Sequence, residues 1–310
     1  MNTNLFNEPK ITFTCVTYNR SKLLKNMIMS FVETNKYENF QWLFLHHDCK
    51  DDTEEFLNSL STDKKYSMLK GKFKVLKGEQ EPYLNELQSL GFDTKTPKKI
   101  GMAQFSYWRN KLTEHIDGDI WIDIPDDHQF IFEGNYCQDI IDVFNHMSPD
   151  GQTCNVGIMT FRTKFLYRLM KQNNKRSEVI MTPSGVEYYV IDSDKPHDEW
   201  NATSFKTFKD LGFYPKLEEE GKSIQTLWNE ADPYYYYHHF QLNRKLREKD
   251  LKRVVLKVPV MHDCLDSKYE EKAKNDECIF PIFKSKEEIK SNFSSIDRPV
   301  SVEEYESLLK

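Results

Sequence analysis

The sequence lacks the features that mark several classes of protein. Its six cysteines are far apart and form no C-x-x-C pair, so it predicts neither a zinc site nor a disulfide framework. No apolar run approaches the roughly 20 residues of a membrane-spanning helix. The first ten residues contain no basic start followed by an apolar stretch. We therefore expect reduced thiols and a cytoplasmic protein without a membrane span.

Blocks of one charge and a glycine-rich phosphate loop are also missing. The formal net charge is −6, and lysines and acids are mixed along the whole length, which argues against nucleic acid as a partner. The segment "TYNRSKLL" (17–24) follows the first predicted strand without a glycine, whereas a sugar nucleotidyltransferase would need a glycine-rich loop there. What is present is 310 residues that are 38% hydrophobic, enough for one large α/β domain.

Strand-like and helix-like segments alternate in the first half of the chain. Strand patterns cover 11–18, 40–47, 73–77 and 119–124, and helix patterns cover 21–34, 52–60 and about 101–116. This order predicts a Rossmann-like α/β fold with a mainly parallel sheet and flanking helices.

Beyond residue 150 the order becomes mixed. Strand patterns occur in 155–163, on both sides of a turn in 177–194, and in 253–261, and a helix is expected near 233–249. We expect one domain over 1–265, with a nucleotide-binding half at about 10–130 and an acceptor-side half at about 131–265. Residues 266–310 are predicted to be a tail that ends in a short helix, which Ser301 and Glu304 begin as a capping box.

Polar clusters follow the predicted strands at the points where these end. They are "TYNR" (17–20), "HHDCKDDT" (46–53), "PDDH" (125–128) and "HDC" (262–264). Each cluster alone could be a helix cap or a solvated turn. Because ligands bind beyond the carboxyl ends of strands in open α/β sheets, four clusters at corresponding ends indicate a site.

The segment "RNKLTEHIDGDIWIDIPDDH" (109–128) resembles family 2 glycosyltransferases. In that family an Arg-Asn pair opens a helix, Gly-Asp ends it, and a hydrophobic strand leads to an acidic D-x-D motif. The first strand and "TYNR" resemble the family's P-T-Y-N-R signature. Residues 208–263 resemble its G-G-F-D, E-D, strand and His arrangement. The resemblance covers about 10–263, except for 160–205.

The resemblance implies a GT-A fold and inverting, metal-dependent transfer of a sugar from a nucleotide-sugar donor to an acceptor hydroxyl. A divalent cation would stabilise charge on the leaving diphosphate, and Mn²⁺ or Mg²⁺ prefers carboxylate oxygens. The implied metal ligands are Asp127 and His262. The implied donor-binding residues are Thr17, Tyr18, Asn19, Arg20, Asp48, Arg109, Asn110 and Asp126.

The chain departs from the family pattern in three places. Pro125 stands where D-x-D has its first acid, so the adjacent Asp126 and Asp127 form the usable pair. Asp48 alone matches the acids of the second-strand motif as a base-recognising group. The E-D pair is stretched to Glu230-Ala231-Asp232. These changes indicate a divergent member.

Asp232 is the candidate general base for the acceptor hydroxyl, and Glu230 is the reserve, followed by Asp198. Pro233 follows Asp232 and suits the first position of a helix, so Asp232 could instead serve only as the N-cap. Trp228 is the best-placed aromatic residue for an acceptor. The acceptor itself, a glycan or another hydroxyl-bearing molecule, is not specified by any motif.

Two other functions remain open at this stage. A non-catalytic descendant of the family would keep the fold for binding only. A metal-dependent phosphoester hydrolase would gather "HHD", "PDDH" and "HDC" into one metal cluster. Metal-dependent binding of a nucleotide sugar separates the transferase from a protein that serves only for interaction.

Overall fold

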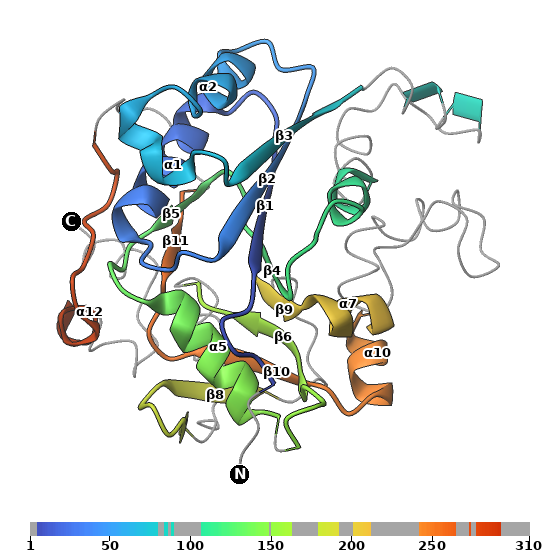
Figure 1. Cartoon of the computed structure of the whole chain (residues 1–310), viewed down its shortest axis with the longest axis vertical. Coiled ribbons are helices and arrows are strands. Elements are labelled where there is room, and N and C mark those ends of the chain that lie inside the picture. The colour runs from blue at the N-terminus through green and yellow to red at the C-terminus, as the bar shows by residue number, and fades with distance from the viewer. Residues whose placement is uncertain are drawn as a thin grey trace.

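A twisted sheet with helices on both faces forms the centre of the computed structural model (Figure 1). The structure describes residues 5–79, 84–85, 88–89, 107–148, 150–162, 179–191, 201–211, 242–264, 273 and 277–292. Among these residues, nine strands form the large sheet, in the order β3 (Phe73–Gly78), β2 (Phe40–His47), β1 (Ile11–Thr17), β4 (Ile120–Asp123), β9 (Ala202–Ser204), β6 (Val156–Thr160), β10 (Lys252–Leu256), β8 (Glu187–Ile191) and β7 (Val179–Met181). A small sheet pairs β5 (His128–Phe130) with β11 (Met261–Asp263).

Strand directions confirm a parallel N-terminal half and a mixed C-terminal half. β1 is parallel to β2 and β4, and β2 is parallel to β3. β9 is antiparallel to both β4 and β6, so β6 runs in the same direction as β4. β10 is parallel to β6, and β8 is antiparallel to β10. The carboxyl ends of β1, β2, β4 and β6 therefore lie along one edge of the sheet.

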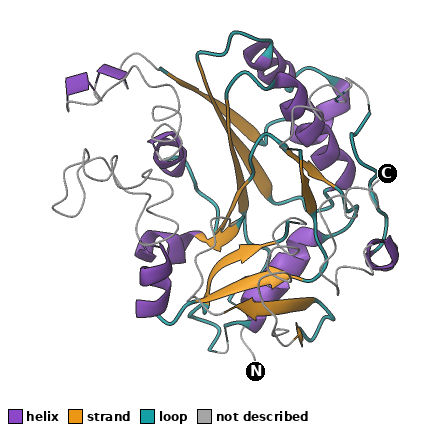
Figure 2. Ribbon diagram, turned by 180° about the vertical axis from the view of Figure 1, so that it is seen from behind, coloured by secondary structure: helices purple, strands orange, loops and turns teal. Residues whose placement is uncertain are grey.

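The apolar run predicted at 40–47 forms β2, which is buried on both faces. Successive side chains of a strand point to opposite faces, so Trp42 and Phe44 join one hydrophobic cluster and Leu43 and Leu45 join the other. Helices α1 and α2 cover the first face, and α7 and the helix through 107–113 cover the second. Figure 2 shows strands of the sheet between these groups of helices. The helices whose bounds the structure gives are α1 (Ser21–Thr34), α2 (Thr53–Ser59), the 3-10 helix η1 (Lys64–Leu69), α5 (Tyr136–His146), α7 (Phe205–Leu211), α10 (Asn243–Glu248) and α12 (Lys286–Asn292).

The strand predicted at 253–261 is divided between two sheets. β10 ends at Leu256, and the chain then leaves the large sheet to form β11. Pro259 lies in the connection, where its missing N–H cannot serve a sheet ladder. The N–H of Val260 instead donates to Phe161 O at 2.9 Å. The partner of β11 is β5, which begins at His128, the last residue of the predicted "PDDH" loop.

The described part of the predicted tail packs onto the main body. Phe280, Phe283 and Ile289 are buried in the same cluster as α1 and β1. The side chain of Gln129 donates to Phe280 O at 2.8 Å and accepts from Phe280 N at 2.9 Å. It thus bonds both backbone groups of Phe280, as the backbone of a neighbouring strand would. Residues 277–289 therefore belong to the same core as the domain predicted to end at 265.

Candidate functional site

Polar side chains from neighbouring strands meet at the carboxyl edge of β1, β2 and β4. Thr17 in β1 is level with His46 in β2, and Thr14 is level with Asp123 in β4. The segments that follow these strands therefore lie beside one another. This is the edge at which α/β sheets bind ligands, as predicted from the four clusters.

Two turns at this edge have left-handed backbone conformations. The φ angle is 51° at Asn19 and 42° at Asp48, and among residues other than glycine, Asn and Asp adopt this conformation most readily. Asn19 Oδ1 accepts a hydrogen bond from Lys50 N at 2.6 Å, and Asp51 Oδ2 accepts one from Ser21 N at 2.9 Å. These bonds tie the turn after β1 to the turn after β2.

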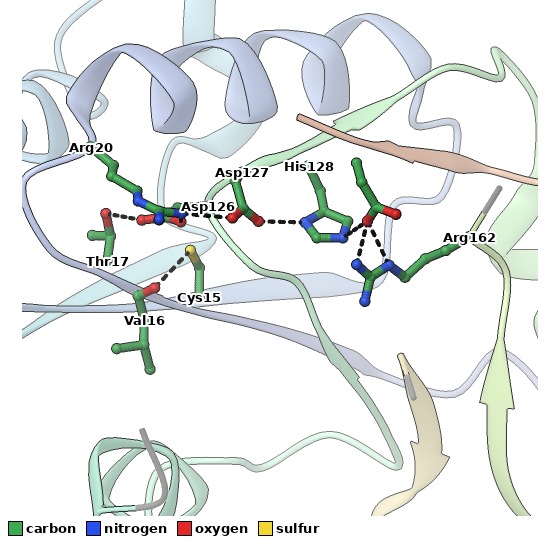
Figure 3. A network of polar contacts seen from close by, with 9 residues as sticks. Cys15, Val16, Thr17, Arg20, Asp126, Asp127, His128 and Arg162 are labelled. Atoms are coloured by element: carbon green, nitrogen blue, oxygen red, sulfur yellow. Dashed lines mark hydrogen bonds and ion pairs between the residues drawn. The ribbon is translucent and has the colours of Figure 1, made fainter. Parts of the chain in front are cut away.

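Asp126 and Asp127 form a buried carboxylate pair beside Arg20 (Figure 3). Arg20 Nη1 lies 2.6 Å from Asp127 Oδ2 and 3.4 Å from Asp126 Oδ1. Thr17 Oγ1 donates to Asp126 Oδ2 at 2.8 Å. One guanidinium nitrogen thus lies against two carboxylates that come from another strand end.

A second group of charges continues from Asp127 into the interior. His128 Nδ1 lies 2.9 Å from Asp127 Oδ1, and His128 Nε2 lies 2.5 Å from Asp263 Oδ1. Arg162, which follows β6, donates through Nε to the same Asp263 oxygen at 2.9 Å. The result is a chain of alternating charge from the half-exposed Arg20 to the buried Arg162. The sequence signals for these partners, "PDDH" and "HDC", did not predict that His128 and Asp263 would meet.

Burial and charge act in different directions on the two aspartates. Burial, followed by the charge of Asp127, raises the pKa of Asp126 from 3.8 to about 6. Burial also acts to raise the pKa of Asp127, but the hydrogen bond and charge of His128 and the charge of Arg20 outweigh it and lower this pKa to about 2. Two carboxylates buried side by side favour a cation between them.

The donor set fits a divalent cation that a substrate helps to bind. Asp126 and Asp127 direct one oxygen each at a single cationic atom, and Mg²⁺ or Mn²⁺ commonly takes one or two carboxylates together with substrate phosphates. Within the described ranges, no three histidine, cysteine or acidic side chains gather into a metal site made by protein alone. Among the described residues, the pair therefore supplies two carboxylates and leaves further coordination positions to other ligands.

His262 lies on the other face of the small sheet. In the register of β11 and β5, Asp263 is opposite His128 and His262 is opposite Gln129. Because neighbouring residues of a strand point to opposite faces, Asp263 contacts the site whereas His262 does not. The ring of His262 packs against Phe280, with 4.3 Å between ring centroids. The acid beside His262, rather than the predicted ligand itself, joins the network around Asp127.

Arg109 forms a second buried ion pair beneath the site. Its side chain is 3% exposed, and Nε donates to Asp123 Oδ2 at 2.6 Å. Thr14 Oγ1 donates to Asp123 Oδ1 at 2.7 Å and accepts from Trp121 Nε1 at 2.8 Å. This pairing accounts for the buried charge of Arg109 without a donor diphosphate. The neighbouring Asn110 lies on the same helix and is half-buried.

A stack of rings lies at the same edge, beside the turn after β1. The ring of Tyr18 is parallel to that of His47 at 4.6 Å, and His47 stacks on Trp108 at 5.4 Å. Tyr18 is 42% exposed, whereas Trp108 and His47 are buried. Burial lowers the pKa of His47 from 6.5 to about 4, so its imidazole is neutral at pH 7. The sequence alone did not predict this platform.

The opposite edge of the sheet holds a cavity of about 650 Å³. Its lining includes Gly118 and Asp119 before β4, Leu251 before β10, and the exposed cations Lys206 and Lys209. This cavity lies at the wrong ends of β1 and β4 for the site predicted from the strand-end clusters.

Several predicted residues lie outside the described ranges. They are the candidate base Asp232, the reserves Glu230 and Asp198, and the acceptor-side Trp228. All six cysteines are free thiols. In the ranges that the structure describes, no helix combines the length and the apolar character needed to cross a membrane.

The sequence matches no protein-family model and no curated protein. Among solved structures, the chain is similar to the mannosyltransferase PcManGT from Pyrobaculum calidifontis in complex with GDP-Man and Mn²⁺, with 13% identity over 86% of this chain and 59% of that chain, and a TM-score of 0.49. It is also similar to S. aureus TarS in complex with UDP-GlcNAc, with 10% identity over 86% of this chain and 61% of that chain, and a TM-score of 0.46. The chain thus spans less than two thirds of either protein.

Proposed function

We propose that the chain is a GT-A glycosyltransferase that moves a sugar from a nucleotide-sugar donor to an acceptor hydroxyl. One observation carries this proposal: a buried pair, Asp126 and Asp127, faces a single cationic atom at the carboxyl edge of parallel strands. A nucleotide diphosphate bound at this edge needs a cation in that position. The turns after β1 and β2 lie beside the pair and are fixed to each other.

On the donor side, the nucleobase stacks on the exposed face of Tyr18, and Asp48 lies near its edge. The stack beneath Tyr18 supports this role, because His47 and Trp108 hold its ring in place. Thr17 keeps Asp126 oriented through a hydrogen bond. Arg109 is already paired with Asp123. We therefore assign Arg109 and its neighbour Asn110 to supporting the site rather than to binding the donor directly.

Asp127, with Asp126 beside it, would hold Mn²⁺ or Mg²⁺. When bound, such a cation supplies Lewis-acid stabilisation of the charge that develops on the leaving diphosphate. His128 fixes the carboxylate of Asp127 through Oδ1, which keeps Oδ2 directed toward the donor side. His262 is not part of this ligand set, because it packs against Phe280.

The inverting reaction needs a general base, and Asp232 is the proposed group, with Glu230 in reserve. Asn caps a helix as well as Asp does, so Asp232→Asn separates the two roles. If Asp232 is the base, the turnover of Asp232→Asn should fall by roughly two orders of magnitude or more while donor binding stays near normal. Steady-state turnover equal to that of the unmodified protein would reduce Asp232 to a cap.

Calorimetric titration with nucleotide sugars, with and without Mn²⁺, tests the proposed function. We expect metal-dependent binding of at least one donor in a panel that includes GDP-Man and UDP-GlcNAc. Asp127→Asn should remove the metal-dependent part of the affinity and leave the fold intact. Asp117→Asn is the matched control, because Asp117 is an exposed acid that pairs with Lys10 at the opposite edge. A metal-dependent donor affinity in Asp127→Asn equal to that of the unmodified protein would contradict the assignment of Asp127 as a metal ligand.

A further inference from the structure

Arg20 occupies the position at which the carboxylate pair would hold its metal. We propose that Arg20 is a built-in counter-cation that competes with the divalent metal for Asp127, so that metal binds tightly only together with the donor diphosphate. This inference rests on the proposed function and adds that the metal and the nucleotide bind together, as one unit.

The contact geometry makes the two cations mutually exclusive at Asp127. Arg20 Nη1 lies 2.6 Å from Asp127 Oδ2 and 3.4 Å from Asp126 Oδ1. A metal on the same oxygen would lie about 2.1 Å from it. The two positive charges would then be no more than about 4.7 Å apart, where their repulsion is strong even near a protein surface.

The guanidinium can leave while the backbone stays in place. Arg20 is the N-cap of α1, and its carbonyl accepts the N–H of Leu24 at 3.0 Å. The preceding Asn19 is held to Lys50. The side chain of Arg20, however, is 45% exposed, whereas those of Asp126 and Asp127 are 8% and 5% exposed. The cation is therefore on the solvent side of the pair, and the acids are fixed beneath it.

Asp127 remains a prepared ligand after Arg20 has left. Its other oxygen, Oδ1, stays bonded to His128 Nδ1 at 2.9 Å, and His128 is itself held by Asp263. The carboxylate therefore cannot turn away when the guanidinium moves. The exchange replaces one cation by another on a fixed acceptor.

Competition lowers the apparent metal affinity of the protein without nucleotide, because only the fraction of molecules with Arg20 displaced can bind metal. A bound diphosphate brings negative charge that can accept the released guanidinium. By linkage, the nucleotide then raises the metal affinity, and the metal raises the nucleotide affinity by the same factor.

The test is a Mn²⁺ titration followed by electron paramagnetic resonance of the free ion, without any nucleotide. Arg20→Gln should bind Mn²⁺ roughly two- to fivefold more tightly than the unmodified protein, the range expected when a half-exposed ion pair is lost. Lys10→Gln is the matched control, because it removes the same charge from an exposed pair at the opposite end of β1. Its affinity should equal that of the unmodified protein. Addition of UDP or GDP should tighten Mn²⁺ binding more in the unmodified protein than in Arg20→Gln.

The outcomes separate this inference from the proposed function. If Arg20→Gln binds Mn²⁺ no more tightly than the unmodified protein, the proposed role of Arg20 is overturned. The proposed function would still stand in that case, provided that Asp127→Asn loses Mn²⁺ binding. Mn²⁺ binding that is independent of Asp127 would instead overturn the function. If Arg20→Gln proves to be unfolded, Arg20→Lys decides, because Lys keeps the charge without the planar fork. We then expect the Mn²⁺ affinity to be about twofold tighter, and an unchanged value would count against Arg20.

Discussion

His47 shows how a single side chain is changed by its neighbours. At the sequence level it belonged to a polar run, "HHDCKDD", from which only Asp48 was assigned a role. In the structure His47 ends the buried strand β2 and lies between Tyr18 and Trp108. Strand pairing and the position of the helix through 107–113 determine this environment, and neither can be inferred from the local sequence.

The lowered pKa of His47 predicts a loss of stability in acid. The unfolded chain takes up a proton near pH 6.5, whereas the folded protein does so only near pH 4. Stability is therefore fully present above pH 6.5 and falls as the pH drops to 4, by up to about 3 kcal/mol for this group. His47→Phe keeps a flat ring but cannot titrate. Urea unfolding from pH 7 to 4 should show a shallower decline for His47→Phe, and identical slopes would contradict the assignment.

Asp126 and Asp127 were identified from sequence, but their partners were not. An acidic pair after an apolar strand is a local pattern, and the family resemblance assigned it to a metal. Asp263 and Arg162 are far from it in sequence, and the register of β5 with β11 brings them near. A shift of this register by one residue would have brought His262 to the site instead, which is why the sequence could not decide between the two.

At the scale of elements, apolar runs predicted the central strands well because both faces of β1, β2 and β4 are buried. The division of 253–261 into β10 and β11 was not predicted, since the run is apolar throughout and only Pro259 marks the break. The small sheet is built from one strand of three residues on each side. Segments this short have no periodicity to detect.

The end of β3 supports the ring stack and provides a prediction at this scale. A Cβ at Gly78 would lie 2.8 Å from two ring atoms of Trp108 and 3.1 Å from His47 Cβ. Gly78→Ala should therefore displace the stack, lower stability by about 1–3 kcal/mol and weaken nucleotide binding.

Gly118→Ala is the matched control for this prediction. Its Cβ would lie 2.6 Å from Thr12 Oγ1 and 2.7 Å from Lys10 O, at the opposite edge of the sheet. It should lower the free energy of unfolding and leave the nucleotide affinity of the folded protein unchanged. Calorimetric titration below the unfolding temperature measures the nucleotide affinity of both variants. Normal nucleotide affinity in Gly78→Ala would show that the stack does not support the base.

For the whole molecule, the α/β class and the edge at which the strand-end clusters gather were predicted, because both follow from the order of strands and helices. The packing of the tail was not predicted. Residues 266–310 were predicted to be a tail, but within "CIFPIF" (278–283) Phe280 and Phe283 lie in the core. A short apolar stretch within a charged segment gives no sign of which surface it covers.

A crystal structure of the protein with a nucleoside diphosphate, UDP or GDP, and Mn²⁺ is the direct test of the proposed site. We expect Mn²⁺ on Asp127, the diphosphate beside it with Arg20 moved off the carboxylates, and the base on Tyr18. A nucleotide in the cavity at the opposite edge, beside Lys206 and Lys209, would contradict this expectation.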